Sequence, residues 1–153
     1  MTRIIWPRVC WVYLILALVL FNITCALVGC ETANAAVNME AIKQIESGGN
    51  PRAYNRGSGA RGLYQITPIC LAHWNQVHRK GEKVDRLWEP GFNREVADWY
   101  FGWLKEAYGF DDVEAIVGYN AGPRRALNYR ALKADLPQET QDYLTKYQAL
   151  TAA

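Results

Sequence analysis

The sequence of 153 residues predicts an all-α, mainly helical single domain that follows an N-terminal export segment. Apolar residues recur at three- and four-residue spacing through much of residues 36–153, which favours amphipathic helices. Prolines stand where several of these helices would begin, and the first turn of a helix tolerates proline. Residues 63–66 alone have the pattern of a short extended segment, so a sheet-based fold is excluded.

The first 35 residues have the composition of an export signal. Arg3 and Arg8 are followed by a continuous apolar run from Val9 to Phe21 and then by small residues. A basic start, an apolar centre and small residues at a cleavage site are typical of a signal peptide.

Three fates of this segment are open. Cleavage after Ala33-Asn34-Ala35 would leave residues 36–153 as the mature domain, whereas the lipobox-like Leu27-Val28-Gly29-Cys30 would leave a lipid on Cys30. Without cleavage, the apolar run would remain as a single membrane anchor helix. In each case we expect the domain to work outside the cytoplasm, in the periplasm or cell envelope.

The first predicted helix of the domain covers residues 37–47. Asn38 can cap its start, and Gly48 suits the left-handed residue that often ends a helix. An irregular loop is expected at residues 50–62, followed by the short extended segment 63–66.

Five further helices are predicted in the remaining sequence. They cover residues 67–78, 93–108, 111–118, 121–132 and 136–150. Residues 79–92 are expected to form a loop, with Asn93 as the cap of the helix that follows. The apolar face of that helix is expected to contain Val96, Trp99, Tyr100, Trp103 and Leu104. The tryptophans at positions 74, 88, 99 and 103 are expected in the core, with one of them able to face a cleft.

Charge and cysteine content exclude several kinds of function. A net charge of +2 is too small to indicate nucleic-acid binding. Cys70 is the only cysteine after the export segment, so we expect a small buried residue and neither a disulfide framework nor a cysteine metal site. His73 and His78 are five residues apart, which does not place two side chains on one helix face, so both are expected at the surface or in packing. We expect no metal and no cofactor.

Glu46 is the strongest candidate for a catalytic residue. It ends the first predicted helix, where the helix dipole disfavours a negative charge, and no Asp or Glu occurs from Ser47 to Gly81. Burial would raise its pKa further, and a carboxyl group that stays protonated can act as a general acid. The alternative is a solvated glutamate in the last turn of a helix.

Four segments occur in order in this domain: ESGGNPRA, GLYQI, GYNAGP and LPQETQDYL. Together they resemble the catalytic domain of the soluble-type lytic transglycosylases, which have a lysozyme-like fold related to goose-type lysozyme. The resemblance extends from about Asn38 to Gln148 and implies a lysozyme-like domain over residues 36–153.

The resemblance implies roles for the matching residues. Glu46 matches the single catalytic acid and base. Substrate-binding roles are implied for Ser47, Tyr64, Gln65, Tyr119, Asn120, Glu139 and Tyr143. In these roles Gln65 would bond to sugar, Tyr64 would keep the apolar contact that a Met or Phe usually makes, and Tyr119 would lie near the catalytic carboxyl.

Two departures from the family pattern concern this site. Gln141 stands where arginine is usual. The loop after Glu46 is one residue longer than in common members, which leaves Asn55 and Ser58 as alternatives for a family serine. Glu139 also falls in the first turn of its helix, where an acid is stabilising in any case.

The resemblance implies an enzyme that acts on peptidoglycan glycan strands. It would cleave the β-1,4 bond between N-acetylmuramic acid and N-acetylglucosamine and leave 1,6-anhydromuramic acid ends, without a cofactor. The alternatives are a hydrolase of the same fold and a non-catalytic glycan-binding module. We expect a monomer, in general wall turnover or with a secretion, conjugation or phage assembly. Arg52, Arg56 and Arg61 would form a solvated loop face, or would attract the acidic stem peptides or anionic polymers of a cell wall.

Overall fold

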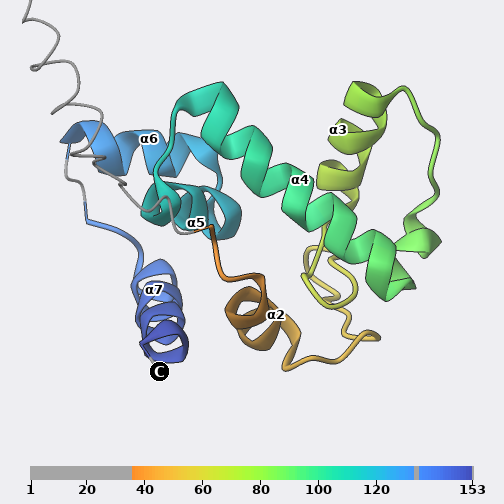
Figure 1. Cartoon of the computed structure of the whole chain (residues 1–153), viewed down its shortest axis with the longest axis horizontal. Coiled ribbons are helices and arrows are strands. Elements are labelled where there is room, and N and C mark those ends of the chain that lie inside the picture. Colours follow the sequence, from red (N-terminus) through yellow and green to blue (C-terminus); the bar gives the residue numbers. More distant parts are fainter. Residues whose placement is uncertain (1–35, 133–134, 153) are drawn as a thin grey trace, which may run out of the picture. The chain divides into compact units, whose positions relative to one another are not determined.

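The computed structural model describes residues 36–132 and 135–152, so the predictions for the export segment 1–35 lie outside the described residues. The elements are α2 (Met39–Ser47), α3 (Pro68–His78), the 3-10 helix η1 (Val84–Trp88), α4 (Pro90–Tyr108), α5 (Asp112–Ala121), α6 (Pro123–Leu132) and α7 (Gln138–Thr151) (Figure 1). The predicted all-α fold is confirmed. In this part of the chain, no helix combines the length and apolar content that crossing a membrane requires.

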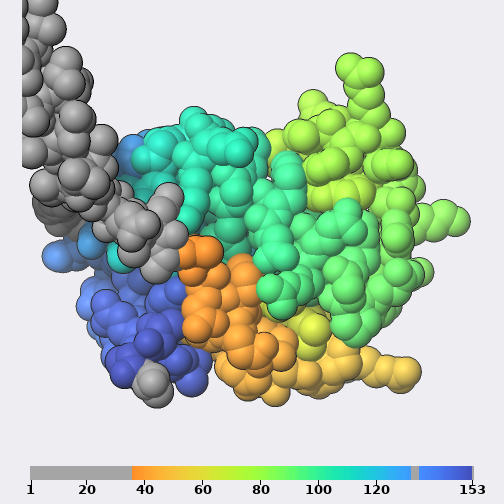
Figure 2. Space-filling view, in the orientation of Figure 1, coloured from red at the N-terminus to blue at the C-terminus, as the bar shows by residue number. Residues whose placement is uncertain are grey.

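The core of the domain forms around α4, which contacts α3, α5 and η1. Val96, Ala97 and Leu104 of α4 are buried in one apolar cluster with Ile42 of α2 and Ile116 of α5. A second set of contacts joins α7 to both α2 and α5. Figure 2 shows α2 on the visible face between α4 and α7. The end of α2, where Glu46 lies, is therefore enclosed by helices that come much later in the sequence.

The caps of the first two helices follow the sequence prediction. The side chain of Asn38 accepts hydrogen bonds from the backbone N–H groups of Glu40 and Ala41 at the start of α2. Thr67 accepts one from Cys70 at the start of α3. Each bond satisfies a donor that the helix itself leaves unpaired.

The predicted start of α4 is wrong. The helix begins at Pro90 rather than at Asn93, and η1 occupies residues 84–88 of the expected loop. Because proline has no N–H and its φ angle is already helical, it suits the first position of a helix. Asn93 therefore lies inside the helix, and its side chain is available for a contact outside it.

Asn93 holds the segment that was predicted to be extended. The side chain is 1% exposed, accepts a bond from the N–H of Tyr64 at 2.8 Å, and donates to the carbonyls of Arg61 and Leu87 at 2.8 and 2.9 Å. These bonds enclose a turn at residues 62–65, so most of the predicted extended segment is wrong. Extended pairing in this part of the chain is limited to isolated bridges, of which one joins Arg61 to Ile66 across the turn.

The tryptophans divide between the core and the surface. Trp74 is 4% exposed and belongs to the core, as predicted. Trp99 and Trp103 are only partly buried, because the fully buried stripe of α4 lies instead at Phe92, Asn93, Val96, Ala97, Phe101 and Leu104. The aromatic residues of the predicted face, Trp99, Tyr100 and Trp103, thus pack against the core cluster but stay partly exposed, and Trp99 reaches His73 of α3.

Candidate functional site

Glu46 lies in the last turn of α2 and is partly buried. Its Oε1 atom accepts a hydrogen bond of 2.8 Å from the hydroxyl of Tyr143 on α7. Burial raises the pKa of Glu46 to about 7; the Tyr143 hydrogen bond lowers it and the negative charge of Glu139 raises it. The carboxyl group can therefore be protonated or ionised near neutral pH, as an acid that also serves as a base requires.

The end of α2 is fixed in two ways. Gly48 adopts a left-handed conformation, with φ of 59°, and its N–H bonds to the carbonyl of Gln44 at 3.0 Å. The hydroxyl of Ser47 lies 2.8 Å from the carbonyl of Leu63 and 3.2 Å from that of Lys43. Ser47 thus fastens α2 to the turn at residues 62–65. Substrate binding was predicted for Ser47, but its hydroxyl is already used in hydrogen bonds within the protein.

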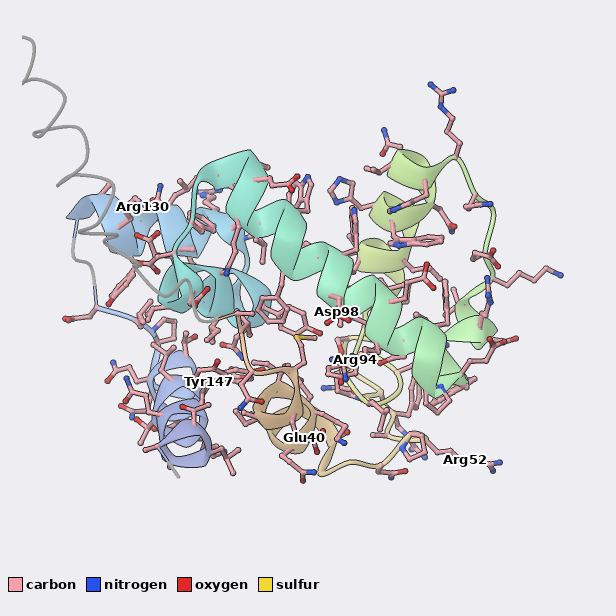
Figure 3. All side chains as sticks on the ribbon, viewed as in Figure 1. Glu40, Arg52, Arg94, Asp98, Arg130 and Tyr147 are labelled. Atoms are coloured by element: carbon pink, nitrogen blue, oxygen red, sulfur yellow. The ribbon has the colours of Figure 1, made fainter. Side chains whose placement is uncertain are left out.

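The predicted contact of Tyr64 with a sugar ring is wrong. The residue is 1% exposed and belongs to the core cluster. Burial raises the pKa of its hydroxyl, and the nearby charges include Arg94 and Asp98, both on α4 (Figure 3). Asn93 holds the backbone of Tyr64, and the ring of Tyr64 packs in the core. The residue supports the turn instead of touching a substrate.

Tyr119, at the end of α5, also holds this turn. Its hydroxyl donates a hydrogen bond of 2.5 Å to the carbonyl of Tyr64, and its ring stacks on Phe101 with centroids 4.4 Å apart. Burial raises the pKa of Tyr119 well above its ordinary value, and the charge of Glu46 adds to this effect, which places the two residues near each other. The hydroxyl that bonds to Glu46, however, is that of Tyr143.

The start of α7 brings three more of the predicted residues to the site. The hydroxyl of Thr140 donates a bond of 2.9 Å to the side-chain oxygen of Asn120, which ties α7 to α5. Glu139 is exposed and lies close enough to Glu46 for its charge to raise the pKa of that carboxyl. Tyr143 is buried. Glu139 and Tyr143 therefore lie at the end of α2, and Asn120 is connected to the same helix, α7, through Thr140.

A cavity of about 180 Å³ adjoins the turn. Its lining comes from the turn, α3, α4 and α5: Gln65, Ile66, Thr67, Ile69, Cys70, His73, Tyr100, Trp103 and Tyr119. Gln65 has a φ angle of +49°, and its amide nitrogen donates to the carbonyls of Ala53 and Gly62 at 3.1 and 3.0 Å. The predicted role of Gln65 in bonding a sugar therefore rests on its amide oxygen.

Aromatic residues form one wall of this cavity, where Trp103 is one of the four tryptophans expected to include a cleft-facing residue and Tyr100 was not assigned to the site. The rings of Tyr100 and Trp103 are stacked with centroids 5.6 Å apart, and His73 meets the ring of Trp103 edge-on at 4.5 Å. A signal existed, because positions 100 and 103 share a helix face with position 96. The fully buried residues of α4 lie on a helix face that is rotated slightly from the predicted one, and only the packing of the other elements determines this rotation.

Cys70 is partly buried against the core cluster and lines this cavity, so the prediction of a small buried residue is confirmed only in part. Burial of its sulfur nevertheless raises the pKa of the thiol to about 12, which leaves it without thiolate character at neutral pH. Within residues 36–132 and 135–152, no three His, Cys, Asp or Glu side chains are grouped so that they could hold a metal ion.

The chain is similar to known proteins in both sequence and fold. Residues 30–141 match the family described as the transglycosylase SLT domain. The fold is similar to that of the 70 kDa soluble lytic transglycosylase Slt70 from Escherichia coli, with 26% sequence identity and a TM-score of 0.62. The match covers 71% of this chain and 20% of that one, so the chain spans about a fifth of the length of Slt70. The chain belongs to the transglycosylase SLT domain family.

Proposed function

We propose that this chain is a peptidoglycan lytic transglycosylase in which Glu46 acts first as the acid and then as the base. The observation that carries the proposal is the carboxyl group of Glu46, with its pKa raised to about 7 and its hydrogen bond from Tyr143. Membership of the transglycosylase SLT domain family supports the reaction class, as does the name of Slt70, a soluble lytic transglycosylase.

In the first step, protonated Glu46 donates its proton to the oxygen that joins C1 of N-acetylmuramic acid to N-acetylglucosamine. The C1–O bond breaks, its electron pair stays with that oxygen, and the N-acetylglucosamine leaves as an alcohol. The carbonyl oxygen of the N-acetyl group on the muramic acid stabilises the positive charge at C1. The raised pKa of Glu46 keeps this proton available near neutral pH.

In the second step, ionised Glu46 removes the proton from the C6 hydroxyl of the same muramic acid. The C6 oxygen forms a bond with C1, which gives a 1,6-anhydro ring and returns Glu46 to its protonated form. No water is consumed, so a second carboxylate to activate water is not required, in contrast to an inverting glycosidase. Glu139 affects the pKa of Glu46 through its charge and contributes to substrate binding in this proposal.

The cavity beside the turn provides the surface for a neighbouring sugar. Tyr100 and Trp103 present partly exposed rings to it, and sugar C–H groups pack well on such faces. Asn120 and Tyr143 hold the start of α7 against the site. With the export segment, the protein acts as a monomer in the periplasm or cell envelope, where its substrate is located.

The pH dependence of the reaction tests the state of Glu46. Because the first step needs the protonated form, kcat/KM should fall as the pH rises through about 7. In Tyr143→Phe the bond that lowers the pKa of Glu46 is lost, so this decline should move to higher pH. The control is Tyr147→Phe on the same helix, whose hydroxyl bonds to the N–H of Asn38 instead. A decline that stays in place or moves to lower pH in Tyr143→Phe would contradict the assignment.

The products distinguish this proposal from its two alternatives. The full-length chain should release muropeptides from purified peptidoglycan that are lighter, by one water, than hydrolytic products in mass spectrometry. Hydrated, reducing ends would identify a hydrolase of the same fold. Binding to peptidoglycan without any release would identify a glycan-binding module.

A further inference from the structure

The loop of residues 50–62 carries positive charge that forms no ion pair with an acid in the described part of the chain. It contains Arg52, Arg56 and Arg61, and the sequence has no Asp or Glu from Ser47 to Gly81. Among the described residues, none of these three guanidinium groups forms an ion pair. Unpaired arginines near a substrate site are available to an anionic part of the substrate.

Arg61 lies against two aromatic rings that also contact each other. Its guanidinium carbon lies 5.2 Å from the ring centre of Tyr54 and 5.8 Å from that of Trp88, and the two ring centres are 6.1 Å apart. One of its nitrogens donates a bond of 2.9 Å to the carbonyl of Gly59. An arginine has five N–H donors, so the held guanidinium retains donors for a ligand. We name Tyr54, Arg61 and Trp88 the aromatic–arginine cluster.

A hollow of about 350 Å³ lies beside the cluster, lined by Arg52 and Trp88. Arg52 extends outward from the loop (Figure 3), and Tyr54 is 50% exposed. Arg52 and the ring of Trp88 therefore face the hollow, and Arg61 and Tyr54 pack against Trp88. This combination suits a flexible chain that has carboxylates and short aliphatic parts.

The cluster adjoins the candidate active site through a single turn. Arg61 pairs with Ile66, with both backbone N–H···O distances at 3.1 Å, and Ile66 lines the cavity described above. The turn between them is the one that Ser47 fastens to the end of α2, directly after Glu46. A ligand in the hollow would thus lie beside a glycan strand bound for cleavage.

We propose that the aromatic–arginine cluster and Arg52 bind the carboxylates of the peptide stems that extend from the glycan strand. This inference rests on the proposed function, because the stems are attached to the muramic acids of peptidoglycan. Arginine matches the planar geometry of a carboxylate, and the rings of Tyr54 and Trp88 contact the aliphatic parts of the peptide. The site selects peptide-bearing strands over bare ones.

The test compares two substrates with the full-length chain. One is peptidoglycan glycan with its peptides, and the other is the same glycan after an amidase has removed them, both freed of attached anionic polymers. We expect kcat/KM to be higher on peptide-bearing strands. Arg52→Gln and Arg61→Gln should each reduce that preference about threefold to fivefold, as expected for an exposed ion pair. Lys80→Gln, which removes an exposed positive charge from the loop after α3, should keep the preference for peptide-bearing strands.

Salt and conservative variants sharpen the test. Raising the salt concentration should reduce the preference of the unmodified chain, because screening weakens exposed charge pairs. Arg52→Lys should retain part of it, since lysine keeps the charge but not the bidentate geometry. Circular dichroism should confirm that each variant is folded.

Three results would overturn the inference. Equal kcat/KM on both substrates, unchanged in the arginine variants, would remove the peptide site and leave the proposed function intact. An equal loss on both substrates in the arginine variants would indicate that these residues only support the loop. Failure of the unmodified chain to cleave either substrate would overturn the proposed function and this inference together.

Discussion

Replacing Glu46 with glutamine is expected to lower the rate of peptidoglycan cleavage by about a hundredfold to ten-thousandfold, the usual contribution of a general acid–base group. Glutamine has nearly the same shape and keeps an oxygen that can accept the hydrogen bond from Tyr143. It has no proton to donate to the glycosidic oxygen. The measurement is the release of muropeptides from purified peptidoglycan by the variant and the unmodified full-length chain. Equal release by the two proteins would contradict the role of Glu46.

The same substitution is expected to stabilise the folded chain above neutral pH. The pKa of Glu46 is raised from 4.5 in the unfolded chain to about 7 in the folded one, so folding favours the protonated form. Below pH 4 both states are protonated and the folded state suffers no penalty. As the pH rises from about 4.5 to 7 stability is lost, because only the unfolded chain ionises freely. Glutamine removes this loss, which is at most about 3 kcal/mol.

Urea unfolding at two pH values measures this effect. The free energy of unfolding of Glu46→Gln should exceed that of the unmodified chain at pH 8 and match it at pH 4. Glu95→Gln, at an exposed position on α4, controls for the loss of one negative charge. An equal change at both pH values would show that burial does not disfavour the charge of Glu46.

Gly62→Ala is expected to destabilise the chain by more than about 3 kcal/mol, at the upper end of single substitutions. Gly62 has a φ angle of +78°, a conformation that an L side chain rarely adopts. A Cβ atom there would lie 2.5 Å from the carbonyl oxygen of Leu87 and 2.5 Å from the side-chain nitrogen of Asn93. The first is backbone and the second is a buried side chain with three hydrogen bonds, so neither can move without losing other contacts.

Gly48→Ala separates the two causes of this cost. Gly48 also has a positive φ angle, of 59°, but a Cβ atom there would have no neighbour within 4 Å. It should cost only about 1 kcal/mol, the backbone penalty for a non-glycine residue in this conformation. Urea unfolding of both variants provides the comparison. Equal destabilisation would show that the close approach of Asn93 to the turn contributes nothing.

Gly62→Ala should also reduce cleavage by the molecules that remain folded. Two carbonyl groups of the turn at residues 62–65 accept hydrogen bonds from side chains. The hydroxyl of Tyr119 donates to the carbonyl of Tyr64, and the hydroxyl of Ser47 donates to that of Leu63. A shift of the turn would therefore displace the end of α2 and with it Glu46.

The places where helices begin and end were largely predictable, because they depend on neighbouring residues. Asn38 and Thr67 cap their helices as expected, and Gly48 ends α2. One exception is the end of α5, which was predicted at Gly118 and lies at Ala121. Another is the start of α4, where a proline and an asparagine three residues apart offered two local solutions. The asparagine side chain bonds to residues about thirty positions away, and the local sequence pattern does not indicate such a contact.

The candidate site was likewise predictable only in part. The position of Glu46 at a helix end and the polar segments around it are visible in the sequence. The hydrogen bond from Tyr143 joins residues 97 positions apart. The burial that raises the pKa of Glu46 depends on tertiary packing, in which α7, the last helix, contacts α2. Tyr64 shows the limit most clearly, since the sequence placed its ring in the cleft and the packing placed it in the core. Backbone propensity acts over a few residues, whereas the direction of a side chain depends on every element that packs against it.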